Sequence, residues 1–599
     1  MIAIRNVAII AHVDHGKTTL VDALLKESKT KLHKDTADSL IMDSNELEKE
    51  RGITIFSKNA SLVWNSIKIN IIDTPGHADF GGEVERVLKM ADGCLLLIDA
   101  KEGPMPQTRF VLKKALEMKH KIIVVINKID KQGIRVNYVL DKTLDLFLEL
   151  GADDQTADFP IVYTSGKEGK AGLTANLKEM TDIVPVFDMI LKHIPAPNGD
   201  EDLPLQMLVT SLSSDSHLGR IAIGRIYNGK ICQNMEVAQI TRNGEIIKNR
   251  ITSLLTFVGL DRIKIKEASS GDIIAITGIK DPSIGETIAD INAPVTLPVL
   301  IVEEPTMQIT FMVNNSPFSG EGQYSTSRQI QARLIKELET DMALRVEINQ
   351  QGGWTVSGRG ELHLAILIER LRREGYEFQV ARPQVIHKVI NGETLQPFER
   401  VFIEVPQNFS GIIMQKLGIR RGVLQDMKTE DGISFLEFIV STKGLFGYRS
   451  EFITDTKGMG TLNSAFDHYA KDNGYEYERT QGSLVVHESG KTNLYGLTNV
   501  QDRGTLFYGP GVDVYKGQIV GENNRSDDLR LNVCKAKHLT NMRSKGDGVS
   551  EYFKTPKSLG LEQALEFIAA DELVEVTPKN IRLRKVILDE VEERRKRFL

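Results

Sequence analysis

Residues 7–27 read VAIIAHVDHGKTTLVDALLKE and predict a strand, a loop and a helix in direct succession. The opening VAII is typical of a strand buried on both faces, and VDALLKE carries apolar residues at helical spacing. The loop between them matches the phosphate-binding loop, with Ala11 at the first glycine position and Gly16, Lys17 and Thr18 at its end. Free backbone amides and the helix dipole favour an anion at such a loop. We therefore expect Lys17 to contact the β- and γ-phosphates of a nucleotide and Thr18 to bind Mg²⁺.

The stretch INIIDTPGH, which ends at His77, places a carboxylate and an imidazole after a second apolar run. Open α/β sheets bind ligands at the carboxyl ends of their strands. Asp73 is therefore expected to hold Mg²⁺ beside the phosphate-binding loop, usually through water. Taken alone, DTPGH is equally consistent with a polar turn. His12 and His15 also form an H-x-x-H pair, but a loop before a helix does not fix both imidazoles for a metal, so the phosphate-binding interpretation is favoured.

A third strand end predicts which base the site recognises. The run IIVVIN ends at Asn127 and is followed by KID, which ends at Asp130. A carboxylate there accepts two hydrogen bonds from the N1–H and N2–H₂ groups of guanine, and adenine offers no such donor pair. A fourth strand, PIVYTSGKEG, ends in Ser165, Gly166 and Lys167, whose amides are expected to reach the guanine carbonyl. For the third stretch alone, a helix cap remains the alternative.

The segment ERGITI, residues 50–55, follows a polar stretch without apolar periodicity that begins at Lys26. Thr54 in this segment is placed to bind Mg²⁺ only while a γ-phosphate is present. We therefore expect the segment to act as a nucleotide-dependent switch.

Length and composition limit the class of protein. A chain of 599 residues is too long for one core and predicts several domains. The formal net charge of −6 does not indicate a nucleic-acid partner, so any basic surface has to be local. Three widely spaced cysteines argue against disulfides and zinc, and fit a reducing cytoplasm. The longest apolar runs are shorter than the roughly 20 residues that span a bilayer, so we expect a cytoplasmic protein without a membrane partner.

The motifs together resemble those of a known family. AHVDHGKTT, ERGITI, DTPGHADF, NKID and TSGK look like the nucleotide motifs of the translational GTPases, the group of elongation factor Tu, elongation factor G and LepA. Longer stretches, among them SGRGELHL, LTNVQDRG, LTNMRSKGDG and EQALEFIAADELVEVTP, resemble the BipA/TypA branch over essentially the whole chain. The resemblance implies a Mg²⁺-dependent GTPase that binds the ribosome in its GTP form and hydrolyses GTP to GDP and phosphate when the ribosome stimulates it.

The expected fold is multidomain. A proline-rich acidic linker, PAPNGDEDLP, is followed by short strands and glycine turns that are typical of a small antiparallel barrel. Two strand and helix patterns then follow that are typical of split βαβ units. The predicted domains are an α/β P-loop GTPase domain (1–198), a β-barrel (199–302), two ferredoxin-like α+β domains (303–382 and 383–479) and a mixed C-terminal RNA-binding domain (480–599).

The resemblance assigns roles to individual residues. His77 matches the histidine that orients the attacking water, and a histidine with only a packing role is the alternative. Asp14 matches a position that helps to hold a monovalent cation in relatives, so such a cation is a further candidate ligand beside GTP, GDP and Mg²⁺. The expected metal ligands are Thr18, Thr54 and Asp73. The expected nucleotide contacts are Asp14, His15, Gly16, Lys17, Thr18, Thr19, Asn127, Lys128, Ile129, Asp130, Ser165 and Gly166.

The C-terminal domain carries CKAKHLTNMRSKGDG, residues 534–548, in which basic residues stand among small polar residues and glycines. Such a loop suits phosphates and single-stranded nucleotides, although a solvated loop is equally consistent with the spacing. The resemblance favours RNA contact through Lys535, Lys537, His538, Asn541, Arg543 and Lys545. It implies the 70S ribosome, ribosomal RNA and an A-site transfer RNA as partners, and leaves guanosine tetraphosphate open as a competitor of GTP. We expect a monomer.

Three functions compete. The leading one is a ribosome-triggered GTPase that acts in translation, ribosome biogenesis or stress adaptation. The second is a nucleotide-switched binding module, an assembly or stress factor in which turnover only resets the state. The third is a LepA-like factor, which LTNVQDRG and LTNMRSKGDG disfavour. A main translocase is disfavoured because no residues remain between the two ferredoxin-like domains for the domain of elongation factor G that reaches the decoding site.

Overall fold

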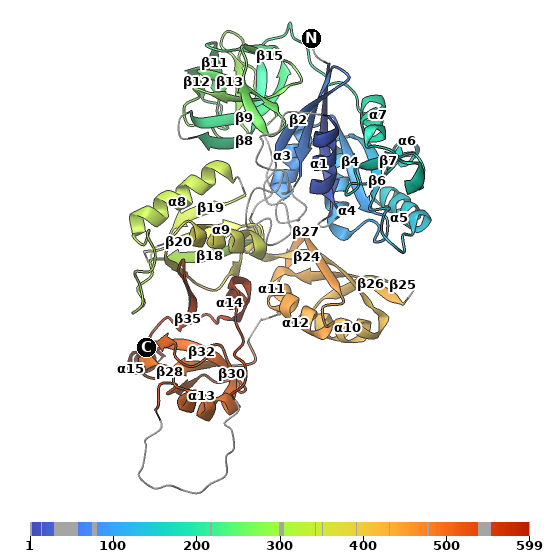
Figure 1. The fold of residues 1–599 in the computed structure, drawn as a ribbon. Helices are drawn as coiled ribbons and strands as arrows, with labels where there is room; N and C mark the ends of the chain where they lie inside the picture. The colour runs from blue at the N-terminus through green and yellow to red at the C-terminus, as the bar shows by residue number, and fades with distance from the viewer. Residues whose placement is uncertain are drawn as a thin grey trace, which may run out of the picture. The chain divides into compact units, whose positions relative to one another are not determined.

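The chain forms two compact units, residues 1–303 with 339–342, and residues 304–338 with 343–599 (Figure 1). The structure is a computed structural model and describes residues 3–12, 15–28, 58–74, 81–215, 218–298, 305–341, 343–349, 352–390, 392–430, 432–475, 479–536 and 553–597. Among these residues, no helix is both long enough and apolar enough to cross a bilayer.

The first unit begins with a seven-stranded sheet in the order β2-β3-β1-β4-β5-β6-β7. Its strands are β1 (Ala3–Ala11), β2 (Asn59–Trp64), β3 (Ile67–Asp73), β4 (Gly93–Asp99), β5 (Lys121–Asn127), β6 (Ile161–Ser165) and β7 (Lys170–Gly172). The five central strands are parallel, and β2 and β7 pair antiparallel at the edges. Both faces of β4 are buried along its whole length, which explains its unbroken apolar sequence.

Helices cover both faces of this sheet. Because side chains alternate along a strand, Val7 and Ile9 of β1 pack on one side, and Ala8 and Ile10 pack on the other. The first side is covered by α1 (Lys17–Glu27) and α7 (Val184–His193), and the second by α3 (Gly81–Met90), α4 (Pro106–Glu117) and α5 (Val136–Glu149). The sequence pattern of strand, loop and helix at residues 7–27 is confirmed.

The barrel region is an eight-stranded sheet in the order β12-β11-β17-β8-β9-β16-β13-β14, in which every neighbouring pair is antiparallel. Its apolar side chains, such as Val209, Ile226 and Ile274, form one core. The strands are β8 (Gln206–Asp215), β9 (Gly219–Asn228), β11 (Glu236–Ile240), β12 (Ile246–Arg250), β13 (Ser253–Val258), β14 (Asp261–Lys264), β16 (Ile273–Thr277) and β17 (Thr287–Asp290), with β10 (Lys230–Cys232) and β15 (Glu267–Ser269) as a separate pair.

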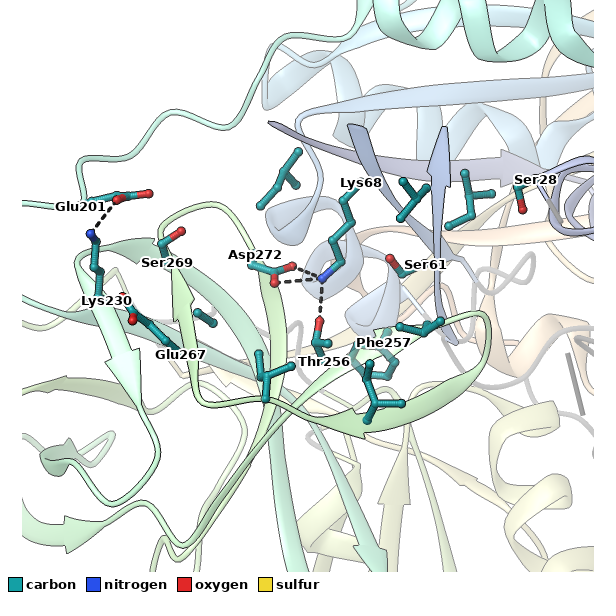
Figure 2. Close-up of a pocket in the computed structure, with 17 residues that line it drawn as sticks. Ser28, Ser61, Lys68, Glu201, Lys230, Thr256, Phe257, Glu267, Ser269 and Asp272 are labelled. Atoms are coloured by element: carbon teal, nitrogen blue, oxygen red, sulfur yellow. Dashed lines mark hydrogen bonds and ion pairs between the residues drawn. The ribbon is translucent and has the colours of Figure 1, made fainter. Parts of the chain in front are cut away.

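Buried polar contacts join the nucleotide-binding sheet to the barrel. The amides of Ser61 and Gly259 each donate to the other residue's carbonyl, at 2.9 and 2.6 Å. The Lys68 ammonium lies 2.6 and 2.9 Å from the two carboxylate oxygens of Asp272 and donates to the Thr256 hydroxyl at 2.6 Å (Figure 2). Lys68, Thr256 and Asp272 are among the residues that line a pocket of about 750 Å³ at this junction. The ammonium is thus neutralised within the interface.

The second unit opens with a ferredoxin-like fold. In chain order it comprises β18 (Met307–Met312), α8 (Ser327–Thr340), β19 (Arg345–Ile348), β20 (Trp354–Gly358), α9 (Glu361–Arg373) and β21 (Phe378–Val380), and the sheet order is β19-β20-β18-β21. The sheet does not stop there. β21 pairs antiparallel with β34 (Glu572–Val576) of the C-terminal domain, with Gln379 opposite Glu575. Phe311 and Phe378 share one core with Val574 and Leu583, so the two regions are packed as one body.

The C-terminal part of this sheet continues from β34 through β35 to β33. It is built from β28 (Ser483–Val486), β30 (Gly504–Leu506), β32 (Gln518–Asn523), β33 (Leu529–Leu531) and β35 (Ile581–Lys585), with the short pair β29 (Gly490–Lys491) and β31 (Asp513–Val514) beside it and the helices α13 (Leu494–Val500), α14 (Leu561–Phe567) and α15 (Glu590–Arg597).

A second ferredoxin-like fold has its own sheet and core. Its elements are β24 (Glu393–Pro406), α10 (Ser410–Ile419), β25 (Val423–Glu430), β26 (Ile433–Ser441), α11 (Thr442–Leu445), α12 (Tyr448–Asp455) and β27 (Thr461–Lys471). β24 lies between β26 and β27, and β25 pairs with β26. Both sheets therefore have the strand arrangement that the two sequence patterns predict.

Candidate nucleotide-binding site

Four of the five parallel strands of the first sheet end in polar residues. Asp73 is the last residue of β3, Asp99 of β4, Asn127 of β5 and Ser165 of β6. All four are almost completely buried. Parallel strands end at the same edge of a sheet, so these side chains gather beside the loop that joins β1 to α1.

The phosphate-binding loop needs a glycine at residue 16 for two reasons. Gly16 has a φ of +90°, a left-handed conformation that side-chain-bearing residues seldom adopt. A Cβ atom on it would also lie 2.5 Å from Asn127 Nδ2. The next residue starts α1, and no side chain caps that helix, so its first amides point toward the space that a phosphate would occupy. Thr18 and Thr19, in its first turn, are half-buried.

Lys17 is held at this end of the site. Its ammonium lies 2.8 Å from Asp73 Oδ1 and donates a hydrogen bond to the Thr74 carbonyl. Lys17 and Asp73 are both less than a tenth exposed. The cation and the carboxylate that the sequence analysis assigned to phosphate and Mg²⁺ are therefore neighbours.

The Asn127 side chain bonds to the phosphate-binding loop and to residues at the end of β6. Its Nδ2 donates to the His15 carbonyl at 2.8 Å, and its Oδ1 accepts from the Thr164 hydroxyl and the Gly166 amide, both at 3.0 Å. The polar atoms of its side chain are thus used within the protein.

Asp130 is positioned by the following strand. The Ser165 hydroxyl donates to Asp130 Oδ1 at 2.7 Å and accepts from the Glu168 amide at 3.3 Å. The Ile129 amide donates to the Thr164 carbonyl at 3.3 Å. The Asp130 carboxylate is half-buried, which leaves it acceptor capacity for two further donors in a fixed direction.

Sequence reasoning missed Asp99, which lies beneath this loop. Its Oδ2 is 3.0 Å from Lys128 Nζ and 3.2 Å from Lys131 Nζ, and its Oδ1 accepts from the Lys101 amide at 2.8 Å. Burial raises the pKa of Asp99, but the hydrogen bonds from Lys101, Lys128 and Lys131 outweigh it and lower the pKa to about 2. The signal in the sequence was an aspartate that ends the apolar run LLLID, just as Asp73 ends INIID.

His15 is buried and neutral. Burial, together with the nearby charge of His12, lowers the pKa of His15 to about 3. Its Nδ1 donates to the Leu97 carbonyl at 3.2 Å, and its Nε2 lies 3.7 Å from a carboxylate oxygen of Glu102. The ring therefore supports the phosphate-binding loop from below, and any nucleotide contact by this residue falls to its backbone.

The oxygen donors at the phosphate end fit Mg²⁺. Mg²⁺ prefers hydroxyl and carboxylate oxygens, and it takes its remaining ligands from substrate phosphates and water. Thr18, which follows Lys17 in α1, and Asp73, which pairs with Lys17, supply such oxygens. In the part of the chain that the structure describes, no group of three or more His, Cys, Asp and Glu side chains is arranged to hold a metal ion by itself.

Comparison with known families covers nearly the whole chain. Residues 2–196 match the elongation factor Tu GTP binding domain, and residues 219–289 match elongation factor Tu domain 2. Residues 323–382 match elongation factor G domain III, and residues 393–480 match the elongation factor G C-terminus. Residues 481–590 match the TypA/BipA C-terminal domain.

Curated relatives are similar over their full length. The chain is 52% identical over 586 residues to the large ribosomal subunit assembly factor BipA of Synechocystis sp., covering 97% of this chain and 98% of the relative. It is 47% identical to the protein of that name from Bacillus subtilis over 593 residues, covering 98% and 97%. The chain belongs to the BipA/TypA family of translational GTPases.

A solved structure supports the fold of the BipA/TypA chain independently. A crystal structure of a protein from Thermus thermophilus aligns with a TM-score of 0.54 at 17% identity, and the alignment covers 79% of this chain and 98% of that one. The predicted fold class, with a GTPase domain, a barrel, two ferredoxin-like domains and a C-terminal domain, is confirmed.

Membership in the BipA/TypA family excludes one of the three functional alternatives. The match at residues 481–590 is to the C-terminal domain of this family, which excludes the LepA-like alternative. The elongation factor Tu GTP binding domain spans the site described above, so the chain is a GTPase that binds guanine nucleotides.

Several predicted site residues of this BipA/TypA member lie outside the described residues. They are Asp14, Thr54, His77, Lys537, His538, Asn541, Arg543 and Lys545. Of the predicted RNA contacts, Lys535 alone lies within the described part, and its side chain is exposed. These assignments stay predictions.

Proposed function

We propose that this chain hydrolyses GTP on the ribosome and acts in the assembly of the large ribosomal subunit. The observation that carries the proposal is that one sheet edge joins a phosphate end, Lys17 beside Asp73, to a base end, Asp130 beside Ser165. Relatives about half identical to this chain are named large ribosomal subunit assembly factors, and that name supplies the ribosomal part of the proposal.

The base end accounts for guanine selectivity. Asp130, oriented by Ser165, accepts the N1–H and N2–H₂ donors of guanine. The Gly166 amide donates to Asn127 Oδ1 at 3.0 Å and so holds its loop at the base end. An adenine in the same place would leave a desolvated carboxylate without donors, which strongly disfavours it. Asn127 holds the base end at a constant distance from the phosphate-binding loop.

The phosphate end accounts for hydrolysis. Lys17 and the first amides of α1 bind the β- and γ-phosphates, and Thr18, Thr54 and Asp73 hold Mg²⁺. When bound, Mg²⁺ neutralises charge on the phosphate oxygens. His77 orients the attacking water, and phosphoryl transfer depends mainly on such positioning. Asp14 is the candidate ligand of a monovalent cation.

The C-terminal domain provides the proposed RNA contact. In this proposal, Lys535 and the basic residues that follow it in the sequence bind phosphates of ribosomal RNA and of an A-site transfer RNA. Guanosine tetraphosphate carries the same guanine base, so it is expected to compete for the nucleotide site.

The first test measures GTP turnover of the purified monomer with and without 70S ribosomes and isolated 50S subunits. We expect stimulation by ribosomal particles and a loss of roughly 100-fold or more in His77→Ala, as is typical when a positioned proton-transfer or water-orienting group is removed. His193→Ala, at the last residue of α7, is the matched control and should keep normal turnover. Normal stimulated turnover in His77→Ala would remove the catalytic assignment.

A second candidate is an assembly factor in which GTP occupancy acts as a switch and hydrolysis only resets it. The relatives' names favour this candidate, since they describe assembly and not turnover. Cells that lack the native protein and produce His77→Ala separate the two by their ribosome profiles on a sucrose gradient. Normal large-subunit assembly would favour the switch, and accumulation of precursors would show that turnover is required.

A further inference from the structure

Asp99, the last residue of β4, and the loop that follows it, residues 100–102, contact the elements that carry the nucleotide motifs. We infer that Asp99 is a positioning residue that slows the release of guanine nucleotide by holding Lys128 against the phosphate-binding loop. This inference rests on the proposed binding of guanine nucleotide at this sheet edge and adds a residue that none of the nucleotide motifs contains.

The Asp99 carboxylate is buried, while the two lysines that pair with it are partly exposed. Asp99 is 0% exposed, and its two carboxylate oxygens accept hydrogen bonds from different partners. Oδ1 accepts from the amides of Lys101 and Glu102, at 2.8 and 3.4 Å, which fixes the carboxylate within its own loop. Oδ2 faces the next strand end and pairs with Lys128 at 3.0 Å and Lys131 at 3.2 Å. The carboxylate is thus a rigid anchor and not a solvated acid.

Lys128 needs such an anchor because of its backbone. It has a φ of +62°, in the left-handed region that disfavours any residue with a Cβ atom. Its Cε atom lies 3.7 Å from the point that a Cβ on Gly16 would occupy, so its alkyl chain lies along the phosphate-binding loop. The ion pair to Asp99 holds the side chain in that position and so supports the loop that carries Asp130.

The same loop also supports the opposite side of the site. The Leu97 carbonyl of β4 accepts from His15 Nδ1 at 3.2 Å, and the Ala100 amide donates to the Asn127 carbonyl at 2.8 Å. β4 and the loop that follows it therefore connect the phosphate-binding loop to the NKID loop without facing either a phosphate or a base. A residue in this position is expected to change how long a nucleotide stays bound and not which nucleotide is chosen.

The test measures the release of a fluorescent GDP analogue during a chase with excess GDP, using the full chain. Asp99→Asn keeps the size and the acceptor of the side chain and removes its charge, and we expect release about tenfold faster, the effect of losing one charge-assisted hydrogen bond. The preference for GDP over XDP should stay as in the native protein, because Asp130 is untouched. Lys131→Met is the matched control, since it removes the second cation on Asp99 and leaves Lys128 paired, and it should release GDP at the native rate within about twofold.

A double-mutant cycle shows whether Asp99 acts through Lys128. Lys128→Met keeps the alkyl chain and removes the ion pair, so it should speed release about as much as Asp99→Asn, and the double variant should be no faster than either. Native release in Asp99→Asn, or effects that multiply in the double variant, would overturn the inference. If Asp99→Asn fails to fold, as judged by thermal unfolding, Lys128→Met decides alone, and native release there overturns it. If the native chain binds no GDP, the proposed function itself fails and the inference falls with it.

Discussion

The two units of this protein both bury carboxylates, but they use them differently. In the first unit, Asp73 and Asp99 stand at the last residues of their strands, beside a loop that is ready to receive an anion. In the second unit, Glu575 lies within β34 and is 0% exposed. It accepts hydrogen bonds from Asn314, Ser316, Tyr515 and Arg582, which are all residues of the same unit.

Glu572, on the same strand, repeats the pattern of the second unit. It accepts from Arg479, Ser483 and the Ala569 amide, and its carboxylate lies 2.9 Å from Lys585. The donors around Glu572 and Glu575 come from the protein itself, and those around Glu575 include Asn314 and Ser316 of the first ferredoxin-like region. Burial of an acid therefore does not by itself indicate a ligand site. Its place at a strand end, beside a loop with free amides, does.

The largest expected effect is on the stability of the second unit. Glu575→Ala leaves three neutral donors, on Asn314, Ser316 and Tyr515, without their buried acceptor, while Arg582 keeps Glu321 as a partner. Each unsatisfied buried donor costs about 1–3 kcal/mol, so we expect a total loss of about 3–5 kcal/mol. In a Trp64→Phe background Trp354 is the remaining tryptophan, and it is buried in the core of the second unit, so its fluorescence reports the urea unfolding of that unit. GDP affinity should stay native. Glu347→Ala, an exposed glutamate on β19, is the control. A native unfolding midpoint in Glu575→Ala would contradict the structural role of the cluster.

In the first unit, we expect a change of base preference. Asp130→Asn replaces an acceptor by an amide that donates to the xanthine carbonyl, so the ratio of GTP to XTP affinity should fall by about 100-fold or more. Competition binding with the two nucleotides measures it, and Asp145→Asn, an exposed carboxylate on α5, should change nothing. If GTP still binds better than XTP, Asp130 does not read the base.

His15 makes the stability of the first unit depend on pH. Its pKa is about 3 in the folded protein, chiefly because it is buried, and near 6.5 when unfolded. The unfolded chain therefore binds a proton that the folded chain rejects as the pH falls below 6.5, and each pH unit lowers the free energy of unfolding by up to about 1.4 kcal/mol. Between pH 6.5 and pH 5 the loss is about 2 kcal/mol. Unfolding followed through Trp64 should show a flatter pH dependence in His15→Gln, and equal slopes in the two proteins would contradict this assignment.

The smallest effect is expected at Ser165. Ser165→Ala removes the hydroxyl that orients Asp130 but leaves the carboxylate in place, so GDP affinity should fall by about fivefold, the usual effect of one lost hydrogen bond. The preference for guanine over xanthine should persist, in contrast to Asp130→Asn. Thr174→Ala, whose hydroxyl contacts Glu179 at the surface, is the control. A switch of base preference in Ser165→Ala would mean that the serine itself reads the base.

Much of the fold and part of the candidate site were predictable from local patterns. The apolar runs that end at Asp73 and Asn127 are strands, and the helix after Gly16 begins at Lys17 as expected. Asp99 was missed because LLLID contains no glycine or basic residue to mark a motif. The predicted domain boundaries at residues 198, 302, 382 and 479 stay predictions. The pairing of β21 with β34 was beyond reach, because no local pattern specifies which strand end will find a partner almost two hundred residues away.

The sequence by itself determined the strands and helices, the order of the nucleotide motifs and the family. These depend on spacing along the chain, which sets which side chains share a face. Three contacts were decided only by the tertiary structure. Asn127 donates to the His15 carbonyl of the phosphate-binding loop, Asp99 pairs with Lys128, and Glu575 accepts from Asn314. Such contacts join residues that are distant in sequence, and their geometry depends on strand register and packing, which no single segment specifies.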